Sequence, residues 1–147
     1  MIIGIAVDHG GYSLKNAIST ASAEWGYEIR DFGAYQFVAD DDYPDFVIPL
    51  SKAIAKREIE RGIAVCGSGI GASICANKIK GVRAGLVTDV FSAHQGVQDD
   101  NMNVICMGAR VIGLELALEL VEVFLKAKFL SFERHLRRLA KLQALEE

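Results

Sequence analysis

Short apolar runs rich in β-branched residues alternate along this chain with segments whose apolar residues recur at helical spacing. The first run, residues 2–7, is continuously apolar, as expected for a strand covered on both faces. Similar runs occupy residues 27–32, 62–65, 83–87 and 104–107. Because this alternation places a crossover helix between successive strands, it predicts a parallel sheet with helices on both faces.

The helical patterns cover residues 12–25, 44 to about 60, 72–78, 92–99 and 114–126, and a basic helix runs from residue 132 towards the end. We find no linker, repeat or low-complexity tract, so residues 1–147 are predicted to form a single domain. The predicted fold is α/β: a doubly wound, Rossmann-like, five-stranded parallel sheet with an extra C-terminal helix. Leucines recur along that helix, which we expect to pack on a partner subunit or on its own sheet.

Charge and cysteine content narrow the choice of partners and compartment. The net charge is −3, which gives no sign of nucleic acid or an anionic membrane as a partner. The three cysteines Cys66, Cys75 and Cys106 have no paired spacing, which favours a reducing compartment. The apolar start is too short to span a membrane and lacks the basic flank of a signal peptide. We therefore predict a cytoplasmic protein.

The loop at residues 66–71, Cys-Gly-Ser-Gly-Ile-Gly, is the most informative segment for function. It follows the third strand, and in open α/β sheets ligands bind outside the carboxyl ends of the strands. Its amide groups can form an anion-binding nest at the start of a helix. Cys66 places a potential base or nucleophile beside this nest, although free cysteines are often only small buried apolar residues. A tight turn or a dinucleotide fingerprint is the alternative interpretation.

Two further segments carry candidate groups. Asp8 and His9 end the first strand before two glycines, where His9 could bind phosphate or move protons, or could simply face solvent behind a helix cap. Arg134 and Arg138 lie four residues apart in the dense basic cluster and share a helix face that suits a phosphate dianion. The cysteines and histidines show no metal-ligand spacing, and the acidic run at residues 40–45 lacks the calcium-loop pattern, so no metal site is predicted.

Taken together, these motifs resemble the ribose-5-phosphate isomerase B family, which includes the galactose-6-phosphate isomerase subunits. The likeness covers essentially the whole chain. The motifs are the segments 8–11, 42–45, 66–71 with 76–78, 101–104 and 108–113, and Arg134-His135 with Arg138. This resemblance implies a cofactor-independent enzyme that interconverts aldose and ketose phosphates. Such an enzyme would act in carbohydrate metabolism, for example in the pentose phosphate pathway. The resemblance also implies a homodimer whose active sites lie between the subunits.

The resemblance implies a role for each matched residue. Cys66 would be the base that moves a proton between the first two sugar carbons. Backbone amides of the same loop would hold the enediolate oxygen. These amides belong to Gly67, Ser68, Gly69, Ile70 and Gly71. Asp8 and Tyr43 would contact the sugar, and a phosphate cluster would consist of His9, Arg110, Arg134 and Arg138, some of them from the partner subunit. Such a site fits the chemistry, since isomerisation needs a base and donors aimed at the developing oxyanion.

One position departs from the family pattern. Ribose-phosphate isomerases of this family have a ring-opening histidine where this chain has Asp99, and the neighbouring asparagine is replaced by Asp100. His94 lies about 140° away around the helix and is a poor substitute. Either Asp99 opens the ring itself, or the substrate has no ring to open, as with a tetrose 4-phosphate. A hexose 6-phosphate is a third possibility.

We expect ribose 5-phosphate and ribulose 5-phosphate as the substrate pair, followed by erythrose or erythrulose 4-phosphate. The non-enzymatic alternative is a phosphosugar-binding module on the same type of sheet, which would need no reactive base. A nicotinamide enzyme fits less well, because the first strand–helix turn lacks the Gly-x-Gly-x-x-Gly spacing.

Overall fold

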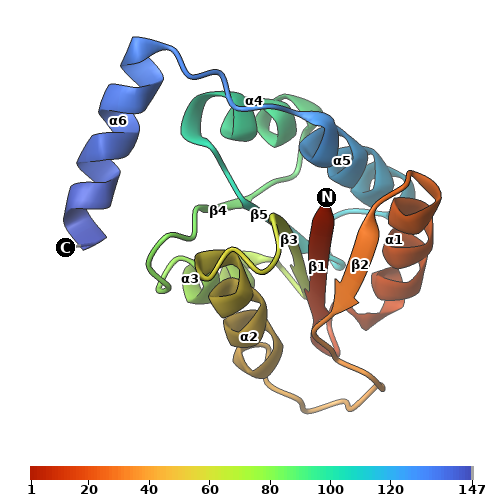
Figure 1. Cartoon of the computed structure of the whole chain (residues 1–147). Coiled ribbons are helices and arrows are strands. Elements are labelled where there is room, and N and C mark those ends of the chain that lie inside the picture. The colour runs from red at the N-terminus through yellow and green to blue at the C-terminus, as the bar shows by residue number, and fades with distance from the viewer. Residues whose placement is uncertain (147) are drawn as a thin grey trace.

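The computed structural model describes residues 1–146. Its strands are β1 Ile2–Val7, β2 Glu28–Asp31, β3 Arg61–Cys66, β4 Ala84–Leu86 and β5 Val104–Gly108. Its α-helices are α1 Tyr12–Glu24, α2 Pro44–Ala55, α3 Ile70–Ala76, α4 Val90–Asp100, α5 Leu114–Lys126 and α6 Glu133–Gln143, which a short 3₁₀ turn extends to Glu146. The strands form one parallel sheet in the order β2-β1-β3-β5-β4 (Figure 1). This architecture confirms the predicted α/β fold.

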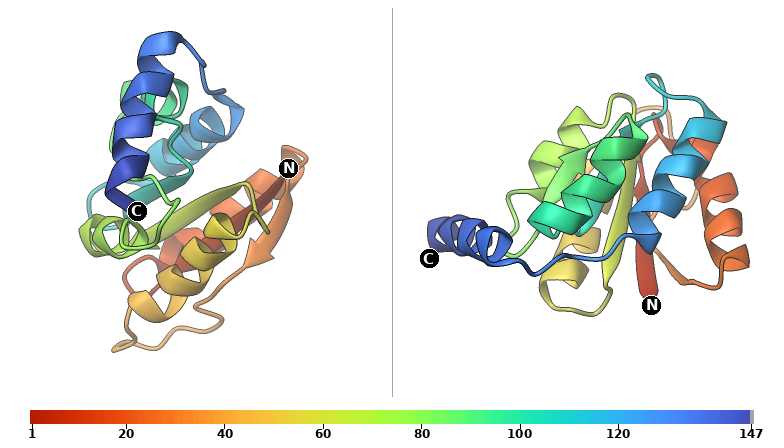
Figure 2. Two further views of the ribbon diagram at one scale, coloured as in Figure 1. Left: turned by 60° about the vertical axis from the view of Figure 1, so that its left-hand side comes forward. Right: turned by 90° about the horizontal axis from the view of Figure 1, so that it is seen from above.

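Helices cover both faces of the sheet (Figure 2). One core joins the sheet to α1, α4 and α5, with Ile18, Val97 and Phe124 among its fully buried side chains. The second core joins the opposite face to α2 and α3. Because the chain winds from β1 to β2 on one side and then passes to β3 on the other, the topological switch lies between β1 and β3.

The face towards α2 is lined by small residues, so this helix lies close to the sheet. A Cβ atom placed on Gly4 would come within 2.7 Å of the Leu50 side chain, and one on Gly62 within 2.9 Å. Leu50 therefore occupies the space that side chains at residues 4 and 62 would need. The opposite face of β1 carries Ile3, Ile5 and Val7, so the fully buried bulky residues of this strand lie on the side of the larger core.

The end of α2 differs from the sequence prediction. The helical pattern extended to about residue 60, but the helix ends at Ala55 and Arg57 adopts a left-handed backbone conformation with φ of 59°. The amide of Glu60 already donates to the carbonyl of Ile2 at 2.9 Å. The chain leaves the helix early because these residues align β3 with β1.

The C-terminal helix α6 stands away from the sheet and lies against α4 (Figures 1 and 2). His135 and Leu139 are its only buried residues. The connecting segment is held to α4 by the amide of Leu130, which donates to the carbonyl of Gln98 at 2.8 Å. Within residues 1–146, no helix combines the length and apolarity needed to cross a membrane.

Candidate active site

A cavity of about 310 Å³ opens at the carboxyl end of the sheet, beside the topological switch. Its lining residues are Asp8, Tyr43, Cys66, Gly67, Ser68, Gly71, Arg110 and Val111. The fold thus brings together residues from β1, the start of α2, the loop after β3 and the turn after β5. Seven of these eight residues are among the predicted site residues.

The loop after β3 places Cys66 at the base of this cavity. The Cys66 side chain is only 4% exposed, and its Sγ accepts a hydrogen bond from the amide of Gly69 at 3.1 Å. This bond requires the left-handed conformation of Gly69, whose φ is 81°. A backbone donor at the sulfur stabilises negative charge there. The arrangement therefore suits a thiolate that accepts a proton from a ligand.

Close backbone contacts fix the loop between its neighbouring strands. The carbonyl of Gly67 accepts from the amide of Arg110 at 3.0 Å, and the amide of Ala109 donates to the carbonyl of Cys66 at 2.9 Å. A Cβ atom on Gly108 would lie only 2.4 Å from the backbone carbon of Ser68. The loop is therefore seated directly on the end of β5, and only glycine fits at residue 108.

Tyr43 and Arg110 flank the loop on two sides. The Tyr43 ring packs against Gly71, where an added Cβ would come within 2.7 Å of the ring. The Arg110 side chain lies over Gly67, 3.6 Å from the corresponding Cβ position. Both side chains can reach a ligand in the cavity, Tyr43 with a hydroxyl group and Arg110 with a permanent positive charge.

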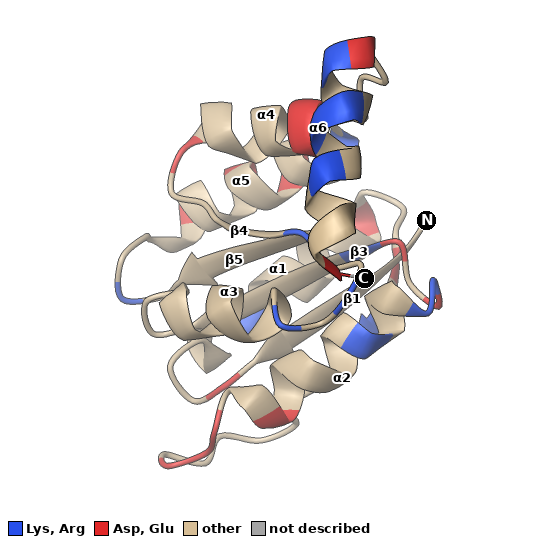
Figure 3. Ribbon diagram, turned by 90° about the vertical axis from the view of Figure 1, so that its left-hand side faces the viewer, with Lys and Arg blue, Asp and Glu red and all other residues tan. Residues whose placement is uncertain are grey.

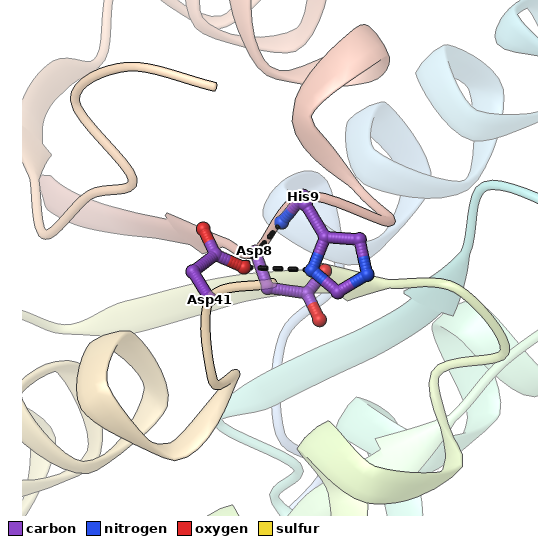
Figure 4. A group of neighbouring side chains, drawn as sticks. All are labelled: Asp8, His9 and Asp41. Carbon is purple, nitrogen blue, oxygen red and sulfur yellow. Dashed lines mark hydrogen bonds and ion pairs between the residues drawn. The ribbon is translucent and has the colours of Figure 1, made fainter. Parts of the chain in front are cut away.

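His9 and Asp41 form a pair next to Asp8, which lines the cavity, whereas neither member of the pair lines it (Figure 4). Oδ1 of Asp41 lies 2.8 Å from the backbone nitrogen of His9 and 2.8 Å from its Nδ1. This hydrogen bond raises the pKa of His9 above 6.5, and the Asp8 charge adds to the effect. One oxygen or nitrogen atom from each of Asp8, His9 and Asp41 lies within 4.8 Å of the others, so two carboxylates lie close to the imidazole.

The other predicted site residues lie elsewhere in the chain. Asp99 and Asp100 occupy the last turn of α4, and Arg134 and Arg138 are exposed on α6, where lysines and arginines recur (Figure 3). The residues on α4 and α6 do not line the Cys66 cavity of their own chain. Gly69 and Ile70 lie on the loop but do not line the cavity either, and Ile70 is 53% exposed.

The environment of Asp99 is not evident from the sequence. His135 is fully buried, and its Nε2 lies 3.6 Å from Oδ1 of Asp99. Its Nδ1 lies 2.6 Å from the carbonyl oxygen of Leu130, and Gln95 donates to the other Asp99 oxygen at 3.0 Å. The position of His135 beside two arginines was visible in the sequence, but nothing in the pattern linked it to Asp99.

Two larger cavities run along α6, with volumes of about 600 and 530 Å³. The first lies between α6 and the β4–α4 region and includes Leu86, Leu142 and Leu145. The second lies between α6 and the end of α2, and includes Arg57 and Arg83. Neither includes Cys66, so they are separate from the thiol cavity.

Comparison with known proteins identifies consistent similarities. A family model described as Ribose/Galactose Isomerase matches residues 3–142. Ribose-5-phosphate isomerase B of Escherichia coli (strain K12) is 37% identical over 145 residues, which cover 99% of this chain and 96% of the relative. D-erythrulose-4-phosphate isomerase of Pectobacterium atrosepticum is 39% identical over 127 residues, covering 86% of this chain and 84% of the relative. Among solved structures, ribose-5-phosphate isomerase B of Clostridium thermocellum superimposes with a TM-score of 0.95 at 42% identity, covering 99% of this chain and 97% of that one.

Proposed function

Because the chain belongs to the ribose/galactose isomerase family of sugar-phosphate isomerases, we propose that it interconverts ribose 5-phosphate and ribulose 5-phosphate with Cys66 as the base. The observation that carries this proposal is the contact between Cys66 Sγ and the Gly69 amide, at the base of a cavity lined by Asp8, Tyr43 and Arg110. A proton acceptor and main-chain donors thus come from one loop.

The reaction follows from this arrangement. The Cys66 thiolate removes the proton from C2 of the open-chain aldose, and the electron pair moves to the carbonyl oxygen on C1. The resulting enediolate is stabilised by amides of the loop at residues 67–71, in the manner of an oxyanion hole. The Cys66 thiol then returns the proton to C1, while the proton of the O2 hydroxyl passes to O1. The ketose forms with no net oxidation, so the step itself consumes no electron acceptor.

The phosphate group needs a cationic site, which one chain supplies only in part. Arg110 lines the cavity and His9 directly follows Asp8, which also lines it, whereas Arg134 and Arg138 lie on α6. We therefore propose a homodimer in which α6 of a second copy brings its arginines to the cavity. Exposed apolar side chains that a second copy would cover support this arrangement. They include Ile70, Ile74, Phe91, Leu142 and Leu145.

A mixing experiment tests the shared site. Cys66→Ala and Arg134→Ala variants should each lose activity, whereas co-expressed variants should form mixed dimers with one intact site. Random pairing of subunits would restore about one quarter of the native activity. Mixed preparations that stay as inactive as the separate variants, although both chains co-purify, would show that each chain uses its own arginine.

Tetrose 4-phosphates are the second candidate substrates, and two observations favour them. The chain has Asp99 where the family resemblance implies a ring-opening histidine, and a tetrose 4-phosphate cannot close a five-membered ring because its 4-oxygen is esterified. The D-erythrulose-4-phosphate isomerase relative is 39% identical to this chain. A hexose 6-phosphate is the third candidate.

Direct assays decide between these substrates and test the enzyme itself. Purified protein is assayed with ribose 5-phosphate, erythrulose 4-phosphate and galactose 6-phosphate, in parallel with Cys66→Ala. We expect turnover of ribose 5-phosphate that the variant loses while it still binds the sugar phosphate. Turnover of only one of the other two sugars would overturn the substrate assignment. Equal turnover by Cys66→Ala would overturn the role of Cys66, and binding without turnover by native protein would indicate a binding module.

We also propose a cytoplasmic location, in keeping with the three unpaired cysteines of residues 1–146. With ribose 5-phosphate as substrate, the enzyme would act in the pentose phosphate pathway.

A further inference from the structure

The pair formed by Asp41 and His9 joins two parts of the chain that lie 32 residues apart. His9 follows β1, and Asp41 belongs to the acidic run before α2. A single carboxylate oxygen, Oδ1, lies 2.8 Å from both the backbone nitrogen and Nδ1 of His9 (Figure 4). Two contacts to one residue fix both the position of its backbone and the rotation of its ring.

This geometry determines which ring nitrogen carries a proton. A carboxylate only accepts hydrogen bonds, so Nδ1 of His9 must be the donor. Nε2 is then left on the side of the ring away from Asp41, as Figure 4 shows. The His9 side chain is 31% exposed, so a ligand can approach the ring. Nε2 becomes a donor only when the ring is an imidazolium.

The surroundings of Asp41 favour that charged ring. The Asp41 side chain is only 10% exposed, and its Oδ2 is buried without a hydrogen-bond partner among residues 1–146. A carboxylate removed from water in this way needs a nearby positive charge. The charged groups that act on His9 are Asp41 and Asp8, and both raise the pKa of His9 above its ordinary value of 6.5. The hydrogen bond to Asp41 is the largest contribution.

We propose that Asp41 is a positioning residue that holds His9 as an imidazolium, with its Nε2–H available to the phosphate of the substrate. The inference rests on the proposed function, in which His9 contacts the phosphate. Without Asp41, His9 would be mostly neutral at the pH where a sugar phosphate is a dianion. Only the charged fraction would bind, and the apparent affinity would fall in proportion to that fraction.

The decisive experiment follows the titration of His9 by ¹⁵N NMR in the native chain and in Asp41→Asn. In the native chain we expect the neutral ring to carry its proton on Nδ1, with a titration midpoint above 6.5. In Asp41→Asn the midpoint should fall towards the ordinary value, because the hydrogen bond that contributes most to the raised pKa is weakened. An ordinary midpoint or an Nε2–H tautomer in the native chain would overturn the proposal, even if the variant failed to fold. An unchanged midpoint in folded Asp41→Asn would also overturn it.

Kinetics provide the second readout. At pH 8, Asp41→Asn should raise KM several-fold, because a fall in the His9 midpoint removes most of the remaining charged ring. At pH 6 the increase in KM should be clearly smaller than at pH 8, since a larger share of the ring is then protonated in both proteins. The kcat should change little, because the Cys66 loop is untouched. A fall in kcat at constant KM would contradict a positioning role through the phosphate.

Two controls complete the design. Asp40→Asn removes an exposed neighbouring carboxylate that forms no hydrogen bond or ion pair with His9 within residues 1–146, and it should leave both the midpoint and KM unchanged. In a His9→Ala background, Asp41→Asn should add no further increase in KM. The NMR titration, repeated with inorganic phosphate, needs no turnover. A lowered midpoint in Asp41→Asn, in a protein that turns over no sugar phosphate, would support the pair and reject the isomerase.

Discussion

His135 Nε2 faces Asp99 Oδ1 across 3.6 Å, from α6 to the last turn of α4. This nitrogen is buried and has no hydrogen-bond partner within residues 1–146. With Nδ1 directed at the carbonyl of Leu130, Nε2 is the ring nitrogen that faces Asp99. A buried imidazole thus lies beside the carboxylate of Asp99, the residue at which this chain departs from the family resemblance.

Replacing Asp99 should separate ring opening from proton transfer. If Asp99 opens the sugar ring, Asp99→Ala should lower turnover of ribose 5-phosphate by about 100-fold or more, the usual effect of losing a general acid or base. Turnover of erythrulose 4-phosphate, which has no ring, should change far less and serves as the internal control. Full activity of Asp99→Ala on ribose 5-phosphate would exclude Asp99 as the ring opener. Initial rates with both sugars provide the measurement.

The thiol of Cys66 should be essential, whereas that of Cys75 should not. Cys66→Ser should reduce kcat by at least about 100-fold, because a hydroxyl is a far weaker base than a thiolate. Burial raises the pKa of the Cys75 thiol, and this residue does not line the cavity. Cys75→Ser should therefore keep turnover close to native. Similar losses in both variants would point to a general folding defect rather than to a catalytic base.

Gly108 should tolerate no side chain, because its Cβ would lie 2.4 Å from the backbone carbon of Ser68. Gly108→Ala must displace the loop that carries Cys66, so we expect a loss of about 100-fold in kcat/KM, since small displacements of catalytic groups have such effects. Gly113 has no atom within 4 Å of the corresponding position. Gly113→Ala is the matched control and should retain activity, with a helix-capping cost below about 1 kcal/mol. Kinetics and urea denaturation of both variants test this contrast.

Arg61 should contribute more to stability than other arginines on the sheet. Its guanidinium group donates to the carbonyls of Phe124 and Ala127, which end α5, and so joins β3 to that helix. Loss of hydrogen bonds from a partly buried charged donor suggests that Arg61→Ala lowers the free energy of unfolding by about 2–4 kcal/mol. Arg30 forms an exposed pair with Glu58 at 3.1 Å, so Arg30→Ala should cost less than about 1 kcal/mol. Equal midpoints in urea for the two variants would contradict this difference.

Local hydrophobic patterns predicted most of the fold, because the spacing of apolar residues in a segment shows which of its faces packs against the rest of the protein. The amphipathic pattern at residues 114–126 reproduces α5 without error, since one face of that helix packs on the sheet along its entire length. The predicted end of α2 was wrong, because a long-range hydrogen bond from the Glu60 amide to the Ile2 carbonyl ends the helix early. No periodicity within residues 44–60 encodes the position of β1.

In the candidate site, too, the residues marked by a local pattern could be predicted, whereas the contacts that depend on tertiary structure could not. Glycine spacing and strand ends identified Cys66, Asp8 and Arg110, which the structure brings to one cavity. The acidic run at residues 40–45 was visible as well, but its contact with His9 depends on how the loop folds back across β1. The link between Asp99 and His135 depends in turn on the packing of α6 against α4. Pairs that form only through tertiary structure leave no pattern in either segment.

The hydrogen bond from the Gly69 amide to Cys66 has a consequence for the evolution of this protein. A main-chain donor is present whichever residue the gene encodes, proline excepted, so point mutation can move such a group but hardly ever delete it. Selection on this loop must therefore act through residues that shape its path, above all Gly69 and Gly108. A semisynthetic protein with an ester in place of the amide at residue 69 would remove the donor while leaving every side chain as inherited.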